Sequence, residues 1–83
     1  MSPAISSEAL AVLTLEEELL RAREFEAAGK EHLEAQEKRV ARLKAKNMRN
    51  HPSEQLLGIM RETHGLQASH VKLLESEIRE LIG

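Results

Sequence analysis

The sequence predicts an all-α fold, an antiparallel helical hairpin of coiled-coil character that assembles into a four-helix bundle as a dimer. Leu, Ala, Glu, Lys and Arg dominate the composition, and these residues favour helices. Apolar residues recur in heptads along most of the chain. Only the segment around Pro52 interrupts this pattern strongly. A chain of 83 residues suffices for one domain, so we predict that residues 1–83 form a single hairpin.

The first helix is expected from about residue 7 to residue 49, and two starts are open. Ser7 can begin one continuous helix. Alternatively, Thr14 and Glu17 form a capping box, which would break the helix near residue 14 and leave a short helix at 7–13. Coiled-coil periodicity runs along the segment on two neighbouring lines. The lines are Val12, Leu19, Glu26, Leu33, Val40, Asn47 and Leu15, Ala22, Gly29, Gln36, Leu43.

A turn is expected at residues 50–52. Pro52 lacks a backbone N–H and disfavours a helical residue before it. Asn47 and Asn50 suit a helix C-cap and a turn. Either Ser53 is the N-cap of the next helix, or Pro52 takes its first helical position. The second helix is therefore expected at about 53–82. A connection this short makes the two helices antiparallel neighbours.

The second helix carries the clearest heptad. Its a and d positions form an unbroken line that is polar only at His64 and Gln67. A second line runs beside the first, so the combined face is too wide for one partner helix and favours a bundle of three or more. The first line is Leu57, Met60, His64, Gln67, Val71, Leu74, Ile78 and Leu81, and the second is Leu56, Ile59, Thr63, Leu66, His70 and Leu73.

Folding at the predicted turn pairs positions whose residue numbers sum to about 102, within about one helical turn. Gln36 would then face Gln67 or Leu66, and Gly29 would lie near Leu73 and Leu74. Residues 7–19 would extend beyond the second helix as an apolar overhang, which indicates a contact surface. We therefore predict a partner or dimer interface made of Leu10, Leu13, Leu15 and Leu19 from the overhang, with Leu57, Met60, Val71, Leu74, Ile78 and Leu81.

Charge is segregated along the chain, although the net charge is only −2. Residues 8–37 carry nine Glu and three basic residues, whereas residues 38–51 carry six basic residues and no acid. This basic segment is a candidate polyanion contact. Helix C-termini favour cations in any case, and Glu16–Glu18 of an antiparallel neighbour would also pair with it. Its members are Lys38, Arg39, Arg42, Lys44, Lys46 and Arg49.

Several kinds of site lack support in the sequence. It contains no cysteine, which excludes disulfides and Cys-based zinc sites. No histidine follows a Glu by three residues, as bundle metal centres require, so His64 and His70 are interpreted as polar positions that fix the helix register. There is no Asp, no nucleophile constellation and no Gly-rich phosphate loop. We expect no enzymatic activity, cofactor, metal or small-molecule substrate.

The predicted function is that of a small, non-enzymatic protein–protein interaction module of the adaptor, chaperone or inhibitor type. It would act through its amphipathic helices, on a second copy and on another protein. The alternative is a dimeric nucleic-acid-associated protein that uses residues 38–49. No apolar run approaches the roughly 20 residues that cross a bilayer, so we expect no membrane partner. The first residues do not resemble a signal peptide, so we expect a cytoplasmic location.

Overall fold

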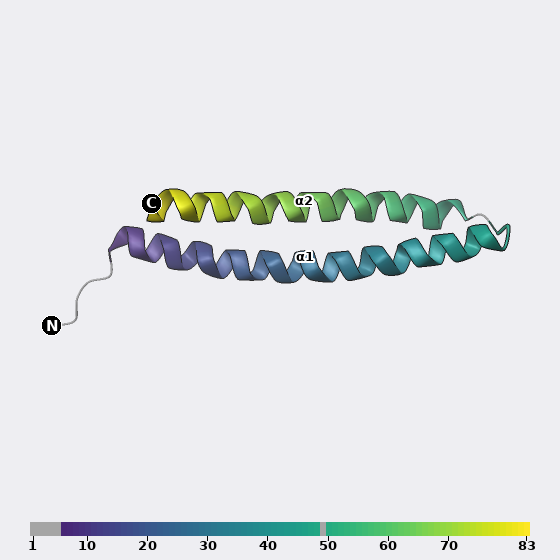
Figure 1. Cartoon of the computed structure of the whole chain (residues 1–83), viewed down its shortest axis with the longest axis horizontal. Helices are drawn as coiled ribbons and strands as arrows, with labels where there is room; N and C mark the ends of the chain where they lie inside the picture. The colour runs from purple at the N-terminus through teal and green to yellow at the C-terminus, as the bar shows by residue number, and fades with distance from the viewer. Residues whose placement is uncertain (1–5, 49) are drawn as a thin grey trace.

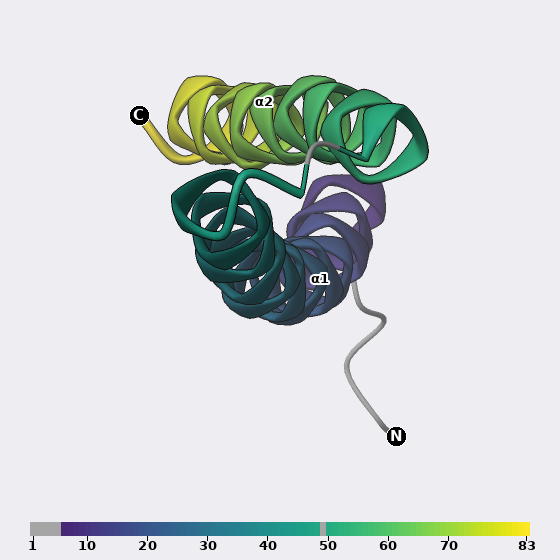
Figure 2. The ribbon, with the colours of Figure 1, turned by 90° about the vertical axis from the view of Figure 1, so that its right-hand side faces the viewer.

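The chain folds as an antiparallel helical hairpin, as the sequence predicts (Figure 1). The computed structural model describes residues 6–48 and 50–83. Helix α1 spans Ser7–Ala45 and helix α2 spans His51–Ile82, and no strand occurs in the described ranges. Viewed along the hairpin, the two helices form one layer and cross over each other, as coiled-coil helices do (Figure 2).

Helix α1 begins at the earlier of the two expected starts and continues through Thr14. The hydroxyl of Ser6 caps it by accepting a hydrogen bond from the backbone N–H of Ala9 at 3.1 Å. The hydroxyl of Thr14 donates to the Leu10 carbonyl at 2.9 Å, one turn back in the same helix. The hydroxyl of Thr14 therefore makes its hydrogen bond inside α1, and Thr14 does not cap a new helix.

The turn uses both asparagines and lies earlier than the sequence indicates. Helix α1 ends at Ala45 and not near residue 49, because Asn47 takes a left-handed conformation with φ 57°. The N–H groups of Asn47 and Met48 donate to the carbonyls of Lys44 and Leu43, which closes a Schellman motif. The side chain of Asn50 then caps α2, which begins two residues before the predicted position 53. Arg49 lies outside the described residues.

The seam between the helices contains the predicted a and d positions. In α2, Leu57, Val71, Leu74 and Ile78 are buried against α1, and Met60 is half-buried. These side chains are therefore covered within one chain. Leu81, at the end of the line, is exposed. The main apolar cluster lies toward the open end of the hairpin and comprises Leu19, Ala22, Val71, Leu74 and Ile78, with Leu15 packed against it.

The register differs from the predicted one. A methyl group added at Gly29 would overlap Oε1 of Gln67, so these two residues face each other. The expectation that Gln36 faces Gln67 is wrong, since Nε2 of Gln36 donates to the Ser53 carbonyl at 2.9 Å. With Ala45 and His51 as its ends, the turn is centred on residue 48, and facing residue numbers sum to about 96. Helix α2 therefore reaches farther along α1.

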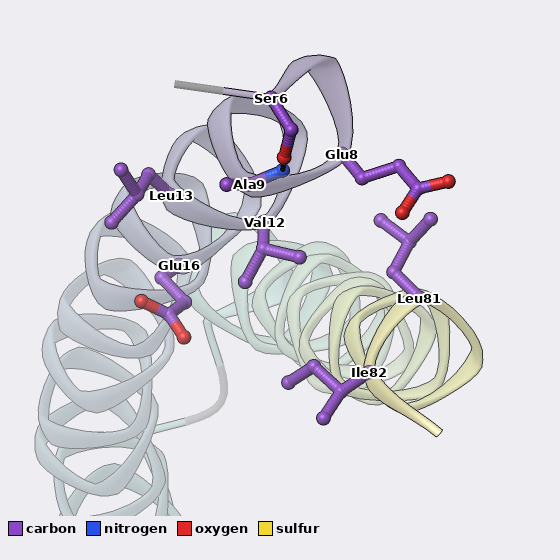
Figure 3. Close-up of a pocket in the computed structure, with 8 residues that line it drawn as sticks. All are labelled: Ser6, Glu8, Ala9, Val12, Leu13, Glu16, Leu81 and Ile82. Atoms are coloured by element: carbon purple, nitrogen blue, oxygen red, sulfur yellow. Dashed lines mark hydrogen bonds between the residues drawn. The ribbon is translucent and has the colours of Figure 1, made fainter. Parts of the chain in front are cut away.

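This shift shortens the expected overhang of residues 7–19. Leu19 is buried and Leu15 is half-buried, so α2 covers both. Val12 also lies close to the end of α2, in a groove shared with Leu81 (Figure 3). Leu10 and Leu13 stay exposed because they occupy positions of α1 that lie off the seam.

Candidate interaction surface

One side of the hairpin is closed by ion pairs between the helices. Each pair joins residues that directly follow a d position of the heptad, so all three pairs lie on the same side of the seam. Their nitrogen–oxygen distances are 3.4, 3.8 and 3.9 Å. We call this side the charged face; it contains the pairs Arg23–Glu75, Glu37–Arg61 and Lys44–Glu54.

The opposite side of the seam is apolar and uncovered. The second heptad line of α2 lies there, and its large side chains are exposed, Leu66 at 73% and Ile59 at 59%. Phe25 of α1 is 67% exposed and lines a shallow depression with His70 of α2, which places both helices on this side. Helical spacing from Phe25 adds Ala28, His32 and Ala35 of α1, with the charged residues Arg21 and Arg39 beyond them. This apolar face comprises Leu56, Ile59, Thr63, Leu66, His70 and Leu73 of α2, with Phe25, Ala28, His32 and Ala35 of α1.

Exposed large apolar side chains recur along the apolar face at Leu56, Ile59, Leu66 and Leu73. Single exposed leucines are normal on a protein surface, whereas a stripe of them marks a contact site. Fully burying each Leu, Ile or Phe side chain would contribute about 1.5–3 kcal/mol. Leu66 and Leu73 are one heptad apart, so a partner helix would bury both at once.

A second apolar patch lies at the open end of the hairpin. A groove of about 490 Å³ separates the first turns of α1 from the last turn of α2, with Val12 and Ile82 on its walls (Figure 3). Leu13 lines its outer edge, and Leu10 is exposed nearby. Of the predicted interface, Leu10, Leu13 and Leu81 therefore remain exposed, whereas the other residues are buried or half-buried in the seam.

The basic segment surrounds the turn. Lys38, Arg39, Arg42, Lys44 and Lys46 are all exposed, and Lys44 pairs with Glu54. The opposite end of the hairpin is acidic. Residues 30–65 carry eight basic residues and five Glu, whereas the rest of the chain carries four basic residues and nine Glu. The hairpin is therefore electrically polar along its length.

The middle of the seam is polar. His64 is half-buried, and its Nε2 has no hydrogen-bond partner in the described part of the chain; the same holds for Oε1 of Gln67. His70 does not share this position, because it lies on the apolar face and is exposed. Within residues 6–48 and 50–83, no three His, Cys, Asp or Glu side chains form a metal-binding group.

No family model, curated protein or solved structure matches this chain. In the described ranges, neither helix combines the length and the apolar content that crossing a membrane requires.

Proposed function

We propose that the protein is a small, non-enzymatic interaction module that binds another helical surface through its apolar face. The observation that carries this proposal is the difference between the two sides of the seam. Ion pairs such as Arg23–Glu75 span one side, whereas Leu66 and Phe25 stand exposed on the other. A stripe of large apolar side chains at heptad spacing is how amphipathic helices recognise each other.

The proposed role is that of an adaptor, chaperone or inhibitor. Such a protein presents a rigid helical surface and contributes no chemistry of its own. The seam supplies the rigidity, because Leu57, Val71 and Leu74 hold α2 against α1 without using the apolar face. Partner binding would then bury side chains that the hairpin itself does not need for folding.

Photocrosslinking in extract of the native host tests the proposal. A benzoylphenylalanine replaces Leu66 on the apolar face in one variant and Ser69, which is exposed and points away from the seam, in the other. We expect a discrete crosslinked product from position 66 and none from position 69. No product from either position, or equal products from both, would contradict the use of the apolar face.

A second candidate function is binding of nucleic acid through the basic segment. The observation that favours it is the exposure of Arg39, Arg42 and Lys46 beside the turn. A gel shift against random duplex DNA should weaken steeply with salt, and the double substitution Arg39→Ala with Arg42→Ala should reduce that salt dependence. Binding that ignores both salt and the double substitution would exclude this candidate.

A further inference from the structure

We infer that a second copy of this chain occupies the apolar face, laid antiparallel so that the two turns lie at opposite ends of a four-helix bundle. The inference rests on the proposed function of the apolar face and adds the identity and the orientation of its occupant. Three properties of the hairpin support it: its charge distribution, the match of side chains across the face, and the area available.

The charge distribution favours the antiparallel orientation. The half of the chain nearest the turn, residues 30–65, carries a net charge of +3, and the remainder carries −5. Antiparallel packing places the positive half of each copy on the negative half of the other. With the turns together, both basic segments would lie side by side, and Glu18 would approach Glu77 of the second copy.

In this orientation, α2 of one copy faces α2 of the other, and the apolar side chains of the two helices lie opposite each other. The apolar stripe runs from Leu56 to Leu73, so a twofold axis passes between residues 64 and 65. Leu56 of one copy then lies beside Leu73 of the other, and Thr63 lies beside Leu66. The same axis meets α1 between residues 31 and 32, because facing residue numbers of the hairpin sum to about 96.

The α1 helices meet through small side chains. On either side of the axis, facing residue numbers of the two copies sum to about 63, so Ala28 of one copy lies beside Ala35 of the other. Small side chains here let the two α1 helices approach each other closely.

The area is sufficient for a stable dimer. The hairpin is 21 Å across its second principal axis. A standard interface buries about 800 Å² per partner, which a strip of this width supplies over about 40 Å of length. Antiparallel overlap of residues 18–45 extends over about 40 Å at 1.5 Å per residue.

Distance measurement by pulsed electron–electron double resonance on spin-labelled protein tests both the occupant and its orientation. The chain contains no cysteine, so a single introduced cysteine takes one label. Met48→Cys places the label beside the turn, and Glu31→Cys places it on the outer side of α1 near the twofold axis. We expect an intermolecular distance of about 50 Å for position 48 and below about 30 Å for position 31, given the helix rise and the spacing of packed helices.

Each other outcome overturns a defined part of the inference. Short distances at both positions would mean that the turns lie together, which contradicts the antiparallel orientation. No intermolecular distance at either position, with a monomeric mass, would exclude a second copy as the occupant. The photocrosslink at position 66 distinguishes a failure of this inference from a failure of the proposed function. A monomeric mass together with a crosslinked product to a different protein would exclude the second copy and keep the apolar face as the binding surface.

Discussion

At the residue scale, Gly29 and Gln67 show how the polar centre of the seam is accommodated. The Gln67 side chain occupies the space that a Cβ at position 29 would need. Gly65, in contrast, has open space around the position of its missing Cβ. Both glycines lie inside helices, where glycine costs about 1 kcal/mol relative to alanine. Their substitution by alanine therefore differs only in what the new methyl group meets.

Gly65→Ala should raise the free energy of unfolding by about 0.5–1 kcal/mol, because helix propensity improves without a clash. Gly29→Ala should give a smaller gain or none, since Gln67 must first move. Urea unfolding followed by circular dichroism measures both changes. Equal gains from the two substitutions would contradict the close approach of Gln67 to Gly29.

The seam predicts a large difference between two adjacent residues. Leu74 is 3% exposed in the main apolar cluster, and its replacement by alanine should cost about 2–5 kcal/mol. Glu75→Ala removes only an exposed ion pair with Arg23, so it should cost less than about 1 kcal/mol. Thermal melts of the two variants make the comparison. Similar losses of stability would mean that the heptad has been placed on the wrong face of α2.

At the element scale, the turn determines how far α2 reaches along α1. The sequence predicts both helices, their antiparallel order and the a and d lines, because heptad spacing is a local pattern. It does not predict the register, which depends on the left-handed conformation of Asn47 and the cap at Asn50. A shift of the turn centre to residue 48 was enough to bring Leu15 and Leu19 under α2.

Phe25 illustrates why part of the candidate site could not be found from the sequence. Phe25 stands among the charged residues 23–26, and a single aromatic residue adds no periodic hydrophobic pattern to the sequence. Its position beside His70 depends on the register of the hairpin. The leucines of the second α2 line do give a signal, and the sequence identifies that line. Which side of the seam the interhelical ion pairs occupy emerges only from the assembled hairpin.

The turn can be tested at Asn47. An ordinary L-residue in the left-handed conformation costs about 1–2 kcal/mol, whereas glycine adopts it freely. Asn47→Ala should therefore lower the free energy of unfolding by about 1 kcal/mol, and Asn47→Gly should maintain or raise it. Lys46→Ala, at φ −92°, is the matched control and should change little. If alanine and glycine are equivalent at position 47, the Schellman motif does not hold this turn.

At the scale of the whole molecule, the two sides of the hairpin differ in how far their side chains are paired within the chain. Its charged face is paired internally, and its apolar face exposes Leu66, Leu73 and Phe25. A helical pair with so little enclosed core is marginally stable by itself. Association through the apolar face would add burial that the single chain lacks, so stability should rise with protein concentration.

Sedimentation equilibrium of the wild type, Leu66→Asp and Ser69→Asp tests the apolar face and its proposed second copy most directly. Both substitutions add one negative charge to an exposed position of α2, but only position 66 lies on the apolar face. We expect dimers for the wild type and Ser69→Asp at micromolar concentration, and a monomer for Leu66→Asp, because an unpaired charge would be buried in the interface. A cooperatively folded wild-type monomer, or a Leu66→Asp variant that remains a dimer, would contradict the account.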